Sequence, residues 1–139
     1  MRPLSTLLVA AALLGTSGGA IAARQQDNSK NEAKLTAALA GRVAGKPVDC
    51  ISLRDIRSSQ IIDGTAIVYD TGGGRLLVNR PRMGAESLDS DDILVTKTYG
   101  SDLCSLDTVS LVDRGARMQR GFVGLGQFVP YTKVKVANP

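Results

Sequence analysis

The sequence predicts a mainly β domain: a small antiparallel, barrel-like or strongly curved sheet with one amphipathic helix at its N-terminus. From Val48 onward, short β-branched runs alternate with turn signals, which is typical of an antiparallel all-β unit. Before that segment, apolar residues recur at helical spacing. No internal repeat or linker is visible, and the 139 − 22 = 117 residues that remain after removal of an expected export signal correspond to one small domain.

The first 22 residues have the pattern of an export signal. Arg2 supplies a positive charge, residues 7–14 (LLVAAALL) are apolar, and residues 20–22 (AIA) match the small-x-small sequence that signal peptidase reads. We expect cleavage after Ala22 and an exported, periplasmic protein; the alternative is an uncleaved N-terminal anchor. A bilayer span needs about 20 apolar residues, so no transmembrane anchor is predicted.

A helix is predicted over residues 30–43, after a polar segment, 23–28, that we expect to be disordered. Ser29 and Glu32 match a capping box, in which each side chain satisfies a backbone N–H at the helix start. One narrow apolar stripe runs along this helix. It consists of Leu35, Leu39 and Val43.

Two hairpins are predicted in the middle of the chain. Asp63-Gly64 is a strong two-residue hairpin signal between residues 60–62 and 65–69. A second turn, residues 71–74 (TGGG), precedes another strand over 75–79. A single helical turn is expected from Ser52 to Arg57, and residues 80–92 form a polar loop.

Further strands are predicted over 93–99, 108–111 and 122–129, which brings the expected total to five to seven. Gly124 and Gly126 in the last of these mark a bend. The domain is expected to span 29–132, followed by an edge strand or loose tail. Five aromatic residues are too few for a stacking platform, so we expect them in the core. They are Tyr69, Tyr99, Phe122, Phe128 and Tyr131.

Cys50 and Cys104 are the only cysteines. In an oxidising compartment, an isolated pair most simply forms a disulfide. A bridge closing a loop of about 55 residues would contribute about 4 kcal/mol in the chain-entropy description. A redox or metal-binding pair is the alternative, but the chain has no C-x-x-C spacing and no histidine.

The composition excludes several classes of function. Without histidine, Ser-His-Asp and Cys-His catalysis are excluded, and the commonest metal ligand is missing. The chain carries 17 Lys+Arg and 13 Asp+Glu, a net charge of +4, and removing Arg2 with the signal leaves 16 − 13 = +3. No Lys/Arg run exceeds two residues, so nucleic-acid binding is not expected. No cofactor or metal is predicted.

Residues 67–73 (IVYDTGG) resemble the active-site loop of aspartic proteases. In that family the aspartate activates a water and the threonine supports it. The resemblance implies a homodimeric, retroviral-type protease in which each chain supplies Asp70. The family's second apolar-apolar-glycine segment has only a loose match, at Val123-Gly124. The alternative is a hairpin turn in which Asp70 caps the backbone through an Asx hydrogen bond.

Other charged residues also allow functional interpretations. Asp89, Asp91 and Asp92 suggest calcium ligands, but no closing glutamate follows, so a solvated acidic loop is favoured. Glu32 and Glu86, the only glutamates, would be available to a carboxylate-based enzyme. The arginines of the β region are expected to form ion pairs, with an anionic ligand or lipid headgroup as the alternative. They are Arg54, Arg57, Arg75, Arg80, Arg82, Arg114, Arg117 and Arg120.

Four segments carry a resemblance to a known family: residues 48–56 (VDCISLRDI), 62–65 (IDGT), 103–104 (LC) and 124–131 (GLGQFVPY). They resemble a family of small exported proteins of Gram-negative bacteria that forms a domain of unknown function. The resemblance spans about residues 41–132, and the family's two matched cysteines fall on Cys50 and Cys104. It implies export and a disulfide, and no catalytic residue.

These observations predict a noncatalytic, disulfide-bridged periplasmic domain that binds an envelope component or another exported protein. The partner would be an envelope protein or an anionic ligand. The aspartic protease built on Asp70 is the alternative.

Overall fold

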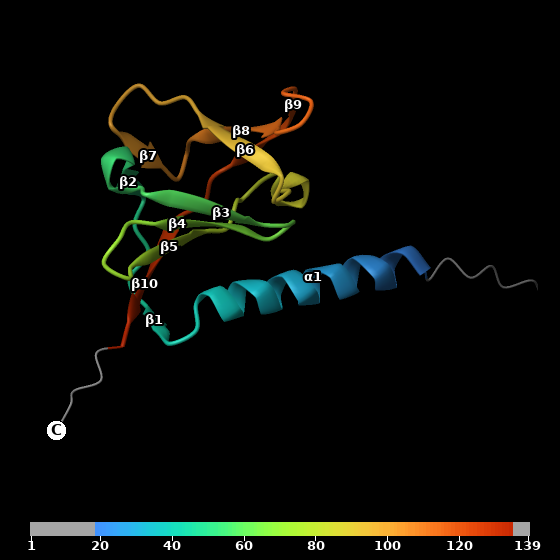
Figure 1. Cartoon of the computed structure of the whole chain (residues 1–139), viewed down its shortest axis with the longest axis horizontal. Helices are drawn as coiled ribbons and strands as arrows, with labels where there is room; N and C mark the ends of the chain where they lie inside the picture. The colour runs from blue at the N-terminus through green and yellow to red at the C-terminus, as the bar shows by residue number, and fades with distance from the viewer. Residues whose placement is uncertain (1–18, 135–139) are drawn as a thin grey trace, which may run out of the picture.

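Three layers build the molecule: helix α1 (Gly19–Ala38), a five-stranded sheet, and a three-stranded sheet on the far side of the larger one (Figure 1). The computed structural model describes residues 19–134, with side chains from residue 28 onward. The fold is mainly β with one helix, as predicted, and its sheets are antiparallel and do not close into a barrel.

The five-stranded sheet is antiparallel throughout, and β4 lies next to its middle strand. Both faces of β4 are covered, which explains its unbroken apolar run. Ile67 and Tyr69 face the smaller sheet, whereas Ala66 and Val68 face α1. In spatial order the strands are β1 (Arg42–Ala44), β10 (Phe128–Lys133), β5 (Leu76–Asn79), β4 (Ala66–Asp70) and β3 (Ser58–Ile62).

The main core lies between the two larger sheets. Alternate residues of the three-stranded sheet, among them Val109, Leu111 and Val123, pack there against Phe128 and Ile67. This sheet contains β6 (Asp92–Thr96), β8 (Thr108–Asp113) and β9 (Gln119–Gly124). A separate pair joins β2 (Cys50–Ser52) to β7 (Asp102–Cys104), and the 3-10 turns are η1 (Leu53–Asp55) and η2 (Ala85–Ser87).

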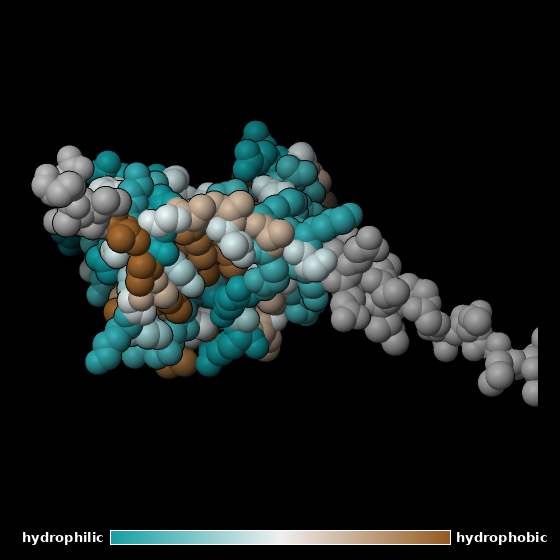
Figure 2. Space-filling model, turned by 90° about the horizontal axis from the view of Figure 1, so that it is seen from below, coloured by the Kyte–Doolittle hydropathy of each residue, from teal (hydrophilic) through white to brown (hydrophobic). Residues whose placement is uncertain are grey.

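Helix α1 covers the other face of the large sheet. Leu35 is buried against Ile62, Ala66 and Val68. The helix leaves part of this face uncovered, and Figure 2 shows apolar surface beside it. Val43 is exposed near this face, and the partly buried residues packed there include Leu39, Leu76 and Tyr131.

One lateral side of the two stacked sheets is closed by chain segments that cross between them. The buried Asn79 donates from Nδ2 to the Gly126 carbonyl (2.6 Å) and accepts from the Gly126 N–H (3.1 Å). Met83 forms an isolated bridge with Gly124 and so covers the edge of β9. On the opposite side, residues 88–90 bond to the β3–β4 turn and close one end of the space between β3 and β6, and no other crossing hydrogen bond is found there among residues 28–134.

The helix prediction was wrong at both ends. The helix ends at Ala38, and Val43 belongs to β1, where it pairs with Thr132. It begins at Gly19 and includes residues 23–28, so Ser29 lies inside the helix instead of capping it. Alanine-rich sequence upstream of Ser29 favours continued helix. The predicted cleavage point after Ala22 falls within its first turns, and most of the predicted signal, residues 1–18, lies outside the described residues.

The predicted number of strands was too low, since residues 19–134 contain ten. Three of them, β1, β2 and β7, have three residues each and show no readable alternation. The segment 122–129 is divided between β9 and β10, which belong to different sheets, so the predicted bend is a change of sheet. The end of the predicted tail, residues 135–139, lies outside the described residues.

The prediction that all aromatic residues are buried was also wrong. Tyr69 and Phe128 do pack in the core, with ring centroids 5.9 Å apart, and Tyr131 is partly buried. Tyr99 and Phe122, however, are exposed.

Candidate functional site

Four cationic side chains gather at one end of the large sheet. Antiparallel pairing places Arg42, the first residue of β1, opposite Lys133, the last residue of β10. Arg75 directly precedes β5 and Arg57 directly precedes β3, so both lie at the same end. We call these four residues the strand-end cluster.

The cluster surrounds the turn that connects β4 to β5. Gly72, Gly73 and Gly74 all have positive φ (79°, 61° and 76°), a conformation that other residues rarely adopt. Asp70 Oδ1 accepts the Gly72 N–H (2.7 Å), and the Arg75 N–H donates to the Gly72 carbonyl (3.0 Å). The four residues after β4 are therefore held in one defined loop.

The glycines also allow the cations to lie directly over the turn. A Cβ added to Gly72 would be 2.5 Å from Arg57 Nε, and one added to Gly74 would be 3.1 Å from Lys133 Cδ. Arg42 Nε donates to the Gly74 carbonyl (3.2 Å), and its Nη1 donates to the Ala38 carbonyl at the end of α1 (3.2 Å). Arg42 is thus fixed by backbone acceptors.

The strand-end cluster has a local excess of positive charge. Among residues 28–134, none of its members forms an ion pair with a carboxylate. In the same part of the chain, the N–H groups of Gly73 and Gly74 have no hydrogen-bond partner. Successive free N–H groups in a glycine-rich turn form a concavity that suits an anion. The arrangement can bind an anionic group through backbone and side-chain donors.

The sequence could not show this cluster as a unit. Arg57 and Arg75 belong to the arginines of the β region, but Arg42 and Lys133 reach them only through the β1–β10 pairing. The other arginines lie elsewhere. Arg80 pairs with Glu32 and Arg120 with Asp89, as expected of ion pairs. The arginines of the β region therefore do not form one patch.

Asp70 occupies the position described by the hairpin-turn interpretation. It is the last residue of β4, and its carboxylate accepts a hydrogen bond from the backbone of the turn. Val123 and Gly124, the loose match to the second protease segment, lie in β9 of the other sheet.

The predicted disulfide is confirmed. Cys50 and Cys104 face each other in the β2–β7 pair, with Cα atoms 4.0 Å apart and their sulfurs bonded. There is no free cysteine among residues 28–134.

The acidic loop differs from the solvated loop that was predicted. Asp89 and Asp91 form an Asx turn, with the Asp91 N–H donating to Asp89 Oδ1 (3.0 Å). The side chain of Asp92, however, is only 1% exposed, and its two oxygens have no hydrogen-bond partner. Arg120 Nε lies 3.5 Å from Asp92 Oδ1. Burial raises the pKa of Asp92, and Arg120 partly opposes this shift.

The two glutamates are on different elements and have different surroundings. Glu32 on α1 forms a two-pronged ion pair with Arg80 (2.6 and 2.8 Å), which lowers the pKa of Glu32. Glu86 is exposed in η2. In the part of the chain described, no group of three or more Cys, Asp or Glu side chains has an arrangement that could hold a metal ion.

Comparisons with protein-family models, with curated proteins and with solved structures found no match. None of the helices in residues 19–134 is both long and apolar enough to cross a membrane. The site is therefore interpreted from its own geometry and charge.

Proposed function

We propose that this protein is a noncatalytic, exported binding domain whose strand-end cluster holds a phosphate-bearing component of the cell envelope. The observation that carries the proposal is the gathering of four cations around a glycine turn with no carboxylate paired to them in residues 28–134. The predicted export signal and the disulfide support the exported location.

The chemistry of the cluster favours phosphate. Arg57 and Arg75 carry guanidinium groups, which match the oxygens of a phosphate with two parallel donors. Lys133 adds a compact charge on a flexible stem, and the free N–H groups of Gly73 and Gly74 add fixed donors. A group with several acceptor oxygens can use all of these donors together.

The phosphate could belong to a lipid headgroup or to a soluble polymer. Each Lys or Arg close to an anionic membrane contributes about 1 kcal/mol of binding free energy. The three cations whose head groups are free of hydrogen bonds, Arg57, Arg75 and Lys133, would together contribute about 3 kcal/mol, which is roughly 100-fold in affinity. The same three cations would attract the phosphate of a lipid and the phosphate of a soluble polymer, so binding to each must be measured.

The test uses two probes on the purified protein: vesicles of phosphatidylglycerol in phosphatidylcholine, and long-chain polyphosphate. We expect binding to at least one probe, weakened by salt because the cluster is exposed. Replacing Arg57, Arg75 and Lys133 by Gln should reduce that binding by about 100-fold.

A matched variant controls for net charge. Arg82, Arg114 and Arg117 are exposed and lie outside the strand-end cluster, and replacing them by Gln removes the same three charges. This variant should keep most of the binding. Equal losses in both variants would show that only overall charge matters, and no binding to either probe would reject the proposal.

A further inference from the structure

Two strand edges with little protection border the open side of the molecule. β3 is the last strand of the five-stranded sheet, and β6 is the last strand of the three-stranded sheet. Proteins commonly protect such edges with lysine, proline or a covering loop. Residues 58–62 and 93–96 contain no charged residue and no proline, and Asp92 at the start of β6 is the one inward-facing charge in these two strands. By contrast, the edge of β9 is covered by Met83, and β1 is only three residues long and begins with Arg42.

The backbone groups that point into this space follow from strand alternation. On β3, the Ile62 carbonyl accepts a hydrogen bond from the Thr65 N–H, so the backbone groups of Ile62 point toward β4. Because this direction alternates along a strand, the backbone groups of residues 60 and 58 also point toward β4. Ser59 and Ile61 therefore direct their N–H and C=O groups outward. These groups have no partner across the open side among residues 28–134.

The same reasoning applies to β6. The Asp92 N–H donates to the Asp89 carbonyl. Asp113, which lies opposite Asp92 in β8, donates its N–H to the Met118 carbonyl on the β9 side. Asp92 is therefore not hydrogen-bonded to β8, and alternation places Leu94 and Thr96 outward as well. Each edge thus offers two residues with free backbone donors and acceptors.

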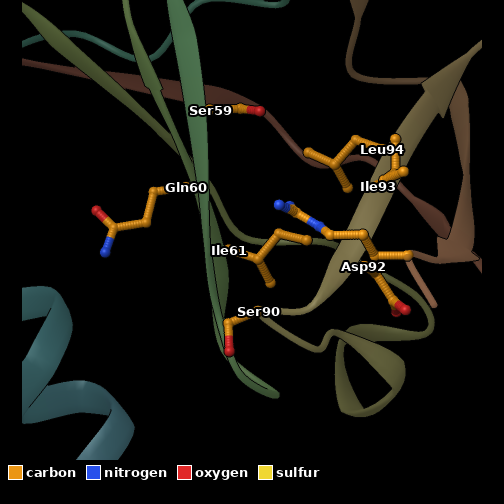
Figure 3. Close-up of a pocket in the computed structure, with 8 residues that line it drawn as sticks. Ser59, Gln60, Ile61, Ser90, Asp92, Ile93 and Leu94 are labelled. Carbon is orange, nitrogen blue, oxygen red and sulfur yellow. The ribbon is translucent and has the colours of Figure 1, made fainter.

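A groove of about 350 Å³ lies between the two edges. Figure 3 shows Ser59 and Ile61 pointing from β3 toward β6, while Gln60 points to the other side. One end of the groove is closed, because the Ser90 N–H donates to Asp63 Oδ1 (2.7 Å) and the Gly64 N–H donates to the Leu88 carbonyl (3.0 Å).

We propose that this groove binds an extended segment of a partner polypeptide, which adds as a strand between β3 and β6 and pairs with both edges. The walls are strand edges, whose regular N–H and C=O groups match an extended backbone. A residue in a packed strand occupies about 150 Å³, from its rise, strand spacing and sheet spacing, so the groove encloses about two residues. A single segment brings no neighbouring layers with it, so it suits this space better than the folded edge of a second copy.

The groove also determines which side chains the segment would carry. Residues facing inward would meet Ile61 and Leu94, which favour apolar side chains, although Asp92 and Arg114 also line the groove. Residues facing outward would lie beside the exposed Ile93 and Val95 on one side and solvent on the other. The bound segment is therefore expected to alternate apolar and polar residues.

A phage-displayed library of random heptapeptides is the probe, selected on the purified protein. Selected peptides should alternate as described and should shift the amide NMR signals of Ser59, Ile61, Leu94 and Thr96. Ser59→Pro and Thr96→Pro each remove one outward N–H, a change that edge strands tolerate. Each should weaken peptide binding by about fivefold to tenfold, the contribution of one backbone hydrogen bond.

Ala44→Pro is the matched control. The Gly45 N–H donates to the Pro130 carbonyl, and the Gly41 carbonyl accepts from the Val134 N–H, so the backbone groups of these two glycines point toward β10. By alternation, Ala44 directs its N–H outward from the edge of β1. This variant should bind the selected peptides as the wild type does. The proposal is overturned if no peptide is enriched, if the shifted amides lie elsewhere, or if the protein dimerises through β6. The NMR shifts on the wild type decide the question even where a proline variant fails to fold.

Discussion

At the scale of single residues, Asp92 has the least favourable environment of the carboxylates in the described chain. Its side chain is buried, and neither oxygen has a hydrogen bond. Arg120 lies beside it and opposes the rise of its pKa, whereas Asp89, Asp91 and Asp113 add negative charge around it. This environment disfavours the charged form and raises the pKa of Asp92.

This environment predicts how stability depends on pH. The folded protein holds the Asp92 proton at pH values where the unfolded chain, with an ordinary pKa near 3.8, has released it. The contribution of Asp92 to the free energy of unfolding is therefore largest below the unfolded-state pKa and is lost as the pH rises through the folded-state pKa. Asp92→Asn should remove this loss of unfolding free energy at rising pH and leave the variant at least as stable as the wild type at pH 7.

Urea unfolding from pH 3 to pH 8 measures the effect. Asp55→Asn is the matched control, because Asp55 is exposed and is not among the charged groups that act on Asp92, and it should keep the wild-type pH dependence. If Asp92→Asn lost more than about 1 kcal/mol at pH 7, its ion pair with Arg120 would outweigh the cost of burial.

Asp70 allows a separate test at the residue scale. Its bond to the Gly72 N–H stabilises the β4–β5 turn, so Asp70→Asn should cost only about 0.5–1 kcal/mol. Thermal unfolding measures this loss, and peptidase assays at acidic pH measure any activity. We expect no cleavage by either protein. Cleavage by the wild type that disappears in Asp70→Asn would support the aspartic protease instead.

Single residues differ in how well the sequence predicted them. The Cys50–Cys104 pair followed from counting cysteines and from the expected compartment. The burial of Asp92 was missed because it was assigned to a polar loop. The pattern that indicates this burial is the alternation of side chains along β6, because Asp92 and Leu94 are two residues apart and therefore face the same, inward side.

At the scale of elements, local signals predicted hairpins well and short strands poorly. The β3–β4 and β4–β5 hairpins formed around Asp63-Gly64 and the TGGG turn, because glycine determines those turns locally. At the first of them the turn has three residues, 63–65, not two. The strand-end cluster depends on β1 pairing with β10, about 90 residues away, and no local pattern reports that pairing.

Helix α1 depends on docking, and its contact with the sheet predicts a local effect. Leu35 supplies the buried contact, whereas the Glu32–Arg80 pair is exposed and worth at most about 1 kcal/mol. Leu35→Ala should destabilise the docked helix by about 2–3 kcal/mol. Hydrogen exchange should show lower protection in residues 28–38 and unchanged protection in β8. The exposed Lys30→Ala is the control, and a uniform loss of protection would mean that helix and sheets unfold together.

At the scale of the whole molecule, the disulfide joins β2 to β7, two short strands that belong to neither of the larger sheets. The loop between Cys50 and Cys104 contains β3, β4 and β5 of one sheet and β6 of another. The β2–β7 pair that carries the bond has only three residues per strand, so its own hydrogen bonds contribute little. The covalent bond therefore keeps the two ends of this large loop together.

Removing the bond should destabilise the entire domain. With 54 residues of separation, the chain-entropy description gives about 4 kcal/mol, and measured losses are typically about 2–5 kcal/mol. Cys50→Ala combined with Cys104→Ala should lower the urea midpoint, and reductant should lower the midpoint of the wild type to a similar value while leaving the double variant unchanged. A wild-type midpoint that does not respond to reductant under unfolding conditions would contradict the bond. A loss below about 1 kcal/mol would instead show that the unfolded chain already holds these segments close together.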